Sequence, residues 1–432
     1  MIQHKPKINS SVSIPVILIC IVTFFFPFVN ILYLFLPINF LGKNLWIVIP
    51  IFVITVLFVM SLVNARQFMV FDKFDIGLLV IAMLGVLIHS VRELLYSESR
   101  SILDLRYIIS SILFLLVFKR FVQGEKNQEW VTAAVLLTCF MQAVLGILHA
   151  HFFSHININV ETLEFFLEAE RTREGGTLGS SIYANFIVCG MFLLVARSSR
   201  LSHAGYGVLE NIAILVMLYA VTLSGSRYPM FCAFLLTAFF LFRSLSNWRQ
   251  TAVLLGAAFI VTSFVLLNEE GVELYSILRF SEDTGGRFDK LVLPLMLLFD
   301  RLLYFLIGVP SDLTAATFSE DGFGISDNSY MLMALQSGVL FAVVWFSFFI
   351  NLLRRNVANG FSFFFMIYVL IGLGLTNSIL WEPWSFVAML ISILIYNGAP
   401  AYRWVFASQS QVKKVEFEYT GFSGDNTSRD LG

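Results

Sequence analysis

Apolar segments long enough to cross a membrane recur along almost the whole chain, and this feature restricts its fold more than any other. About 20 consecutive apolar residues span the hydrocarbon core of a bilayer as a helix. Twelve such segments lie at about 12–36, 45–63, 75–91, 102–118, 130–150, 179–196, 208–224, 229–242, 251–267, 329–352, 361–379 and 385–398. Only 13% of the 432 residues are charged, against roughly 25% in soluble domains. The sequence therefore predicts an all-α, polytopic integral membrane protein with about 12 transmembrane helices.

The distribution of Lys and Arg predicts the orientation of these helices. Basic residues concentrate in loops that face the cytoplasm. If the N-terminus is cytoplasmic, the inside loops contain most of them, among them Lys5, Arg66, Arg197, Arg354 and Arg355. The short outside loops contain few Lys or Arg residues. We therefore expect a multi-pass membrane protein with both termini cytoplasmic.

A thirteenth apolar segment, 291–309, does not fit as a full span. Asp300 and Arg301 would then lie near the middle of the bilayer, at roughly 2.5–3.5 kcal/mol each, and Pro294 would interrupt the helix. A further span would also place Arg354 and Arg355 outside. We interpret 291–309 as a re-entrant or interfacial helix inside one large loop on the outside, 268–328, which is periplasmic if the membrane is a bacterial inner membrane. The transmembrane domain then comprises 1–407, and the polar end, 408–432, is predicted to be a disordered cytoplasmic tail.

The four cysteines and the histidines suggest no metal site or disulfide. Each Cys lies in an apolar segment without a partner at metal-ligand spacing, which is typical of small buried side chains. His149, His151 and His155 gather at a predicted membrane edge, but no Cys or carboxylate completes a known metal-binding pattern. No extended basic patch indicates nucleic acid as a partner. We expect no cofactor and no metal.

Four regions on the predicted outside contain nearly all the unusual polar residues. They are RTREGGTLGSSIYANF (171–186), TLSGSRYP (222–229), EDTGGRFDK (282–290) and SDNSY (326–330). Simple interpretations exist for each residue alone: Arg227 could extend from a helix end to the interface, and Asp327 could cap the helix that starts at Ser329. Together, however, several Arg residues and a carboxylate converge on one side of the membrane. Arg binds phosphate in a bidentate manner, so a polyprenyl-diphosphate-linked sugar would suit this set.

Three local patterns resemble the superfamily of O-antigen polymerases and O-antigen ligases. Arg173-x-x-Gly176-Thr177 resembles the family's R-x-x-G-T segment, and residues 223–227, LSGSR, resemble its T-x-S-R turn. Gly285-Gly286-Arg287, followed by an apolar helix and then by residues 327–330, DNSY, resembles its large extracytoplasmic loop. The similarity covers about 170–340. It implies a membrane glycosyltransferase fold (GT-C-like) with a periplasmic active site.

The resemblance also implies roles for individual residues. An acceptor hydroxyl attacks the anomeric carbon of a glycan linked to undecaprenyl diphosphate, and arginines stabilise the leaving diphosphate without a metal. Arg173, Arg227, Arg287 and Arg171 are then the residues that bind the diphosphate. Asp327 occupies the position of the base, with Arg287 and Asn328 beside it in catalysis. A chain-length regulator in the membrane is a candidate partner, besides the bilayer and the lipid-linked oligosaccharide.

Ligases of this superfamily have His where this chain has Asp327, which favours a polymerase of O-antigen or a related surface polysaccharide. Two alternatives stay open. One is a ligase that transfers finished polymer to lipid A–core in lipopolysaccharide biosynthesis. The other is a transporter of the same lipid-linked oligosaccharide, for which ionisable residues at mid-membrane and two similar halves are expected. Arg106 is the main charge within a predicted span, and no convincing repeat is present.

Overall fold

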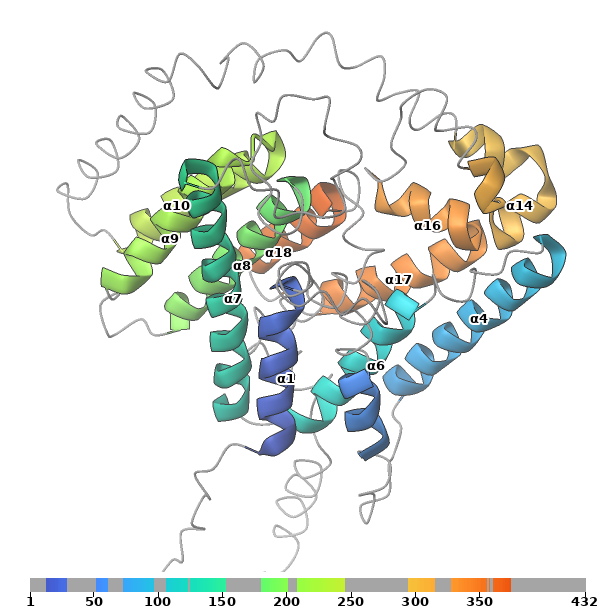
Figure 1. Ribbon diagram of the computed structural model, residues 1–432, viewed down its shortest axis with the longest axis horizontal. Coiled ribbons are helices and arrows are strands. Elements are labelled where there is room, and N and C mark those ends of the chain that lie inside the picture. The colour runs from blue at the N-terminus through green and yellow to red at the C-terminus, as the bar shows by residue number, and fades with distance from the viewer. Residues whose placement is uncertain are drawn as a thin grey trace, which may run out of the picture.

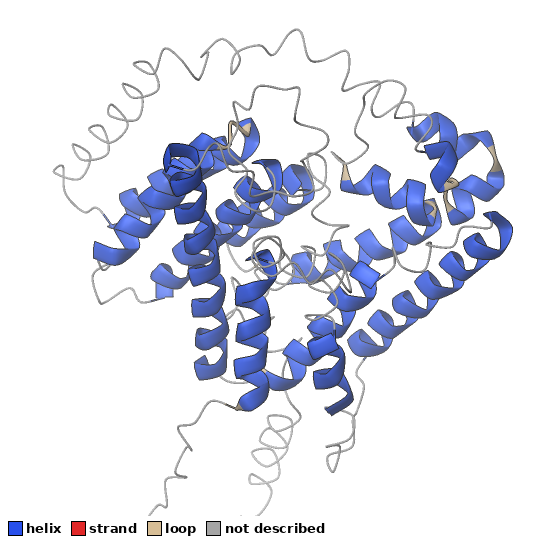
Figure 2. Cartoon of the chain, viewed as in Figure 1, coloured by secondary structure: helices blue, strands red, loops and turns tan. Residues whose placement is uncertain are grey.

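The computed structural model describes residues 13–28, 52–60, 73–96, 106–122, 125–152, 180–200, 208–244, 294–314, 328–355, 357 and 360–373. Nearly all of these residues are helical, and no strand occurs among them (Figure 2). This confirms the all-α class for the described part of the chain. The labelled elements are α1 (Ile14–Phe25), η1 (Phe26–Phe28), α4 (Lys73–Tyr96), α6 (Arg106–Phe121), α7 (Glu125–Phe152), α8 (Ser180–Arg200), α9 (Val208–Leu223), α10 (Arg227–Ser244), α14 (Leu302–Ile307), α16 (Ser329–Ser337), α17 (Val339–Arg355), α18 (Gly360–Ile367) and the π-helical segment η4 (Tyr368–Leu373).

The helices form two groups that lie side by side in Figure 1. In the first group α7 packs against α1, α8 and α9, and α10 packs against α8 and α9. In the second group α17 contacts α14, α16 and α4. α18 and η4 connect the two groups, because α18 contacts α17 and η4 contacts α10. The ring of Phe192 in α8 packs against Phe365 of α18 at 4.9 Å between ring centroids.

Two helices, α4 and residues 126–152 of α7, are long and apolar enough to cross a membrane. Several shorter apolar helices accompany them, in α1, α8, α9, α10, α17 and α18. The count of twelve spans stays a prediction, because the segments 251–267 and 385–398 lie outside the described residues.

α4 exposes several large apolar side chains and buries three ionisable ones, Asp75, His89 and Arg92. Met83 is 73% exposed, whereas His89 and Arg92 are 0% and 3% exposed. A soluble helix shows the reverse arrangement, since charged side chains need water. Ionisable residues inside a membrane bundle face the protein interior and pair with other polar groups. At the start of the same helix, Asp75 accepts a hydrogen bond from Lys119 of α6 at 2.7 Å.

Two predicted segments are interrupted, which corrects the sequence interpretation. The segment 329–352 is not one helix, because Gly338 separates α16 from α17 with a φ of 83°. The segment 291–309 is not one helix either. It contains helical residues 294–300, then α14, and a helix at 311–314 follows, with breaks at Arg301 and Gly308. Asp300 and Arg301 are 64% and 68% exposed in their side chains, as expected for residues that avoid the interior.

Candidate functional site

The start of α16 contains one of the residues that the sequence singled out. Asn328 is the N-cap of this helix, and its Oδ1 accepts hydrogen bonds from the backbone N–H groups of Tyr330 at 3.0 Å and Met331 at 3.2 Å. Asn is among the preferred N-cap residues for this reason. The capping role that the sequence suggested for Asp327 therefore belongs to Asn328. Asp327 itself lies outside the described residues.

The second motif, TLSGSRYP, forms a tight turn between α9 and α10. Ser224 is buried, and its hydroxyl donates to the carbonyl of Val221 at 2.6 Å and accepts from the N–H of Ser226 at 3.2 Å. Gly225 has a φ of 63°, in the left-handed region that glycine adopts without a Cβ penalty. α10 begins directly afterwards, at Arg227. The turn thus fixes Arg227 as the first residue of a helix.

Three helices that start within predicted motifs meet at η4. From α8, Asn185 Oδ1 accepts a hydrogen bond from the hydroxyl of Tyr368 at 2.6 Å. From the first turn of α10, Tyr228 stacks on Tyr368, with ring centroids 5.6 Å apart and planes within 6°. From the first turn of α16, the Tyr330 hydroxyl donates to the carbonyl of Leu370 at 2.6 Å. Figure 1 shows the orange-red segment of α18 and η4 between α8 and α16.

The π-helical segment η4 accepts a side-chain hydrogen bond on its backbone. A π-helical turn changes the regular i→i−4 hydrogen-bonding pattern and is frequent at functional sites. Tyr330 supplies a donor to the Leu370 carbonyl within this segment. The ring of Tyr330 also packs edge-on against Phe346 of α17 at 4.3 Å. These contacts fix the first turn of α16 on two sides.

Most of the arginines predicted to bind a diphosphate lie outside the described residues. These are Arg171, Arg173 and Arg287. The structure places the backbone of Arg227 at the start of α10 and Asn328 at the start of α16. It also brings together the helices that follow the first, second and fourth motifs, through their contacts with η4.

Sequence reasoning missed several polar residues that the fold uses. Asn185 and Tyr368 are buried partners from segments 183 residues apart; Asn185 lies in the region 171–186 but was given no role, and Tyr368 lies in none of the four regions. Arg92 lies one residue beyond the predicted end of its span, 75–91, so it was not counted as a charge within the membrane. A single polar residue inside an apolar helix, such as Asn185, is a signal that could have identified this contact.

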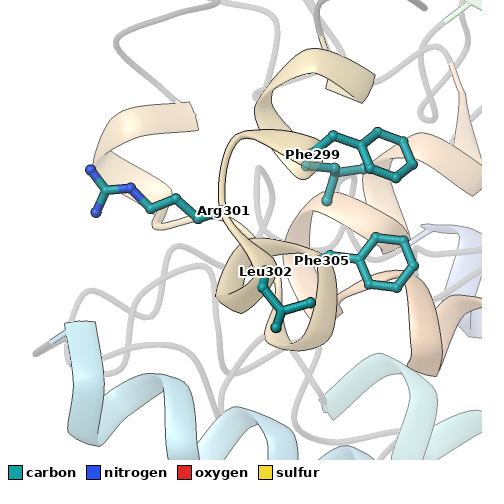
Figure 3. Close-up of a pocket in the computed structure, with 5 residues that line it drawn as sticks. Phe299, Arg301, Leu302 and Phe305 are labelled. Atoms are coloured by element: carbon teal, nitrogen blue, oxygen red, sulfur yellow. The ribbon is translucent and has the colours of Figure 1, made fainter.

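A shallow apolar depression of about 340 Å³ lies beside α14, away from these helix starts. Leu298, Phe299, Arg301, Leu302 and Phe305 line it. Figure 3 shows the rings of Phe299 and Phe305 on one side, while the side chain of Arg301 extends to the other. The charge of Arg301 therefore does not face the apolar floor, and this depression lacks the features of a phosphate site.

The predicted histidine cluster forms contacts of another kind. His151 Nε2 lies 2.7 Å from the hydroxyl of Tyr219, and the two rings are stacked. His155 lies outside the described residues. Within the ranges that the structure describes, no group of three His, Cys, Asp or Glu side chains is arranged to hold a metal ion.

The fold is that of a helical protein in which some helices are long enough to span a membrane. Its candidate site is the place where the first turns of three helices meet at η4. Comparison with protein-family models gives no match for this chain. Neither the curated proteins nor the solved structures include one that matches it.

Proposed function

We propose that the chain is a glycosyltransferase of surface-polysaccharide assembly, which polymerises glycan repeat units carried on undecaprenyl diphosphate at the periplasmic face of the inner membrane. One observation carries this proposal. The helices that follow three of the four motifs, α8, α10 and α16, contact one another through η4, although the motifs are spread over about 160 residues of sequence.

The electrostatics of these helix starts favour an anionic substrate. A helix N-terminus has the effect of roughly half a positive charge, and its free N–H groups bind phosphate. An Arg at the first position of a helix adds a cation to that positive end, which is unfavourable without a nearby anion. α10 begins with such a residue, Arg227. A diphosphate close to this helix start would relieve the repulsion.

The reaction follows from the residues assigned to the site. The acceptor hydroxyl attacks the anomeric carbon, a new C–O bond forms, and the bond from that carbon to the diphosphate oxygen breaks. The diphosphate leaves with the electron pair and is stabilised by Arg171, Arg173, Arg227 and Arg287. The hydroxyl proton passes to the Asp327 carboxylate. The Oδ1 of Asn328 caps α16, so its Nδ2 amide is the end that can donate to Asp327 or to the sugar.

Contacts between helix ends support the alternating orientation that the sequence predicts. Asp75 and Lys119 pair at helix ends that are both predicted to be cytoplasmic. His151 and Tyr219 pair near helix ends that are both predicted to be periplasmic. In the same orientation, α8, α10 and α16 all start on the periplasmic side, where the lipid-linked donor is exposed.

The first test is a gel of lipopolysaccharide from the source strain lacking the gene. A polymerase predicts core bearing a single repeat unit and loss of the ladder. Bare core, with polymer accumulating on the lipid carrier, would instead assign the ligase function. An unchanged ladder would exclude both activities on O-antigen.

The second test uses point variants in the complemented strain. Arg227→Lys and Asp327→Asn should each shorten or abolish the ladder at normal protein level, because Lys lacks the bidentate geometry of Arg and Asn cannot accept the proton. Matched controls are Arg301→Lys and Asp312→Asn, exposed residues near α14. Equal ladders from the site and control variants would refute the assignment of these residues.

A further inference from the structure

α4 presents three polar side chains to the ends of α14 and α16. His89 Nε2 lies 3.0 Å from the Ser337 hydroxyl at the end of α16. Arg92 Nη2 donates to the carbonyl of Val309 at 2.9 Å, and the Tyr96 hydroxyl donates to the carbonyl of Gly308 at 3.0 Å. His89, Arg92 and Tyr96 recur at intervals of three and four residues, so they share one face of the helix. We call these three residues the α4 cluster.

The two helix ends that the α4 cluster contacts are joined directly to each other. The N–H of Val309 donates to the carbonyl of Leu335 at 2.7 Å. A Cβ atom on Gly308 would lie 2.5 Å from that same carbonyl oxygen, and one on Gly338 would overlap the carbonyl of Leu306. Only glycine at both positions allows the two backbones to approach this closely. We call this contact the α14–α16 junction.

The chemistry of the α4 cluster matches the junction it contacts. The last carbonyl groups of a helix have no partner within the helix, and the helix dipole makes this end negative. A cation that donates to carbonyls there is therefore favourable. Arg92 is 3% exposed and His89 is fully buried, within a helix long enough to span a membrane. A helix that only had to cross a membrane would need no polar side chains at these positions. We therefore attribute the three polar residues to the junction.

The helix α16 connects this junction to the proposed active site. It has nine residues, and at 1.5 Å per residue it extends about 13 Å. Its first turn is held by the bond from Tyr330 to Leu370, and its end is held at the junction. Asn328 stands at the first of these ends, and Asp327 precedes it in the sequence. Any tilt of α16 at the junction would move them relative to η4.

We propose that the α4 cluster consists of positioning residues, which hold α14 and α16 as one unit and thereby fix the site at the start of α16. This inference rests on the proposed glycosyltransferase function. It predicts that loss of the cluster slows the transfer step and leaves binding of the lipid-linked donor intact. The donor diphosphate is assigned to arginines in other segments, so its affinity should not depend on the junction.

The experiment has two arms, both on the full chain in detergent micelles. The first arm measures hydrogen–deuterium exchange in peptides covering 302–310 and 333–340, in Arg92→Met and in Tyr96→Phe, which removes only a hydroxyl. Exchange should rise about tenfold in Arg92→Met, in line with loss of a buried charge-assisted hydrogen bond, and less in Tyr96→Phe. Tyr219→Phe, which removes a hydroxyl outside the junction, should leave these peptides unchanged. Arg92→Lys should restore most of the protection.

The second arm measures polymer formation from the undecaprenyl-diphosphate-linked repeat unit. We expect kcat to fall about tenfold in Arg92→Met with KM for the donor within about twofold of wild type, and partial recovery in Arg92→Lys. Unchanged exchange would overturn the role at the junction. Raised exchange with unchanged kcat would overturn the positioning role. A wild-type protein that forms no polymer would refute the proposed function, while the exchange arm still decides whether the cluster holds the junction.

Discussion

Gly338 provides the sharpest test of the junction, because alanine there should destabilise the protein for reasons that can be estimated. Its backbone has φ 83° and ψ 157°, a region that is essentially restricted to glycine and costs other residues about 1–3 kcal/mol. The added Cβ would also lie 2.8 Å from the backbone nitrogen of Ile307. Backbone atoms cannot rotate away as a side chain can. Gly338→Ala should therefore shift α14 as well as α16.

Gly77 is the matched control for this substitution. It lies inside α4, and the nearest atom to a Cβ there is in the ring of Phe348, at 3.9 Å. This is ordinary contact, and replacing a glycine inside a helix by alanine stabilises the helix by up to about 1 kcal/mol. The two Gly→Ala substitutions thus have opposite expected signs.

The assay is thermal unfolding of each purified variant in the same detergent, followed by intrinsic fluorescence. We expect Gly338→Ala to lower the apparent midpoint by about 2–10 °C, from 1–3 kcal/mol and the usual conversion for domains of moderate size. Gly77→Ala should leave it unchanged or raise it. Equal midpoints for the two variants would refute the argument that the junction requires glycine.

Three further substitutions test contacts elsewhere in the fold, each by the same unfolding assay. Lys119→Met should destabilise the protein by about 1–3 kcal/mol, because it leaves the Asp75 carboxylate without its 2.7 Å partner. Adding Asp75→Asn should recover part of this loss. If the double variant recovers no stability, the pairing is contradicted. Tyr368→Phe removes the hydroxyl that donates to Asn185 and should cost about 1–3 kcal/mol, less in a background that already has Asn185→Leu. Gln142→Leu deletes the donor to the Pro27 carbonyl at 3.0 Å and should cost a similar amount, about 1–3 kcal/mol; an unchanged midpoint would show that this bond does not hold η1 against α7.

Helix positions followed from the sequence wherever hydrophobicity alone determines them. The segment 75–91 was predicted within α4, and 208–224 was predicted almost to the residue in α9. The cost of burying a charge was also the ground for placing Asp300 and Arg301 outside the bilayer; their side chains are exposed, and the placement of 291–309 relative to the membrane stays a prediction. In each case a local property, the apolar length or the cost of burying a charge, is sufficient for the prediction.

Breaks within apolar segments did not follow from the sequence. Gly338 stands inside a continuous apolar run, and glycine is tolerated in membrane helices, so nothing local marks it as a helix end. Its conformation is required by the approach of Leu306, which is 32 residues earlier in the chain. The π-helical form of η4 likewise accompanies a partner, Tyr330, from a distant segment. Such features depend on tertiary contacts that periodicity does not contain.

For the candidate site, the sequence identified the helix starts but not what joins them. The motifs at Arg227 and Asn328 were singled out, and both prove to be first-turn or capping positions of helices. Of the joining residues, Tyr368 lies outside the four regions, and Asn185 lies in the first of them without a role that the sequence could assign. Their importance follows only from the 2.6 Å bond between them.

The hydrogen bond from Val309 to Leu335 affects how freely the sequence between α14 and α16 can change. It joins the chain at two points 26 residues apart, so the described residues up to Thr314 and from Asn328 are held relative to each other. Lengthening a segment between fixed ends costs little, only about 0.6 kcal/mol for each doubling of its length. Insertions and substitutions in the sequence 315–326 should therefore leave α14 and α16 in place. Under the proposed function, sequence variation directly before Asp327 would adapt one scaffold to acceptors of different shape.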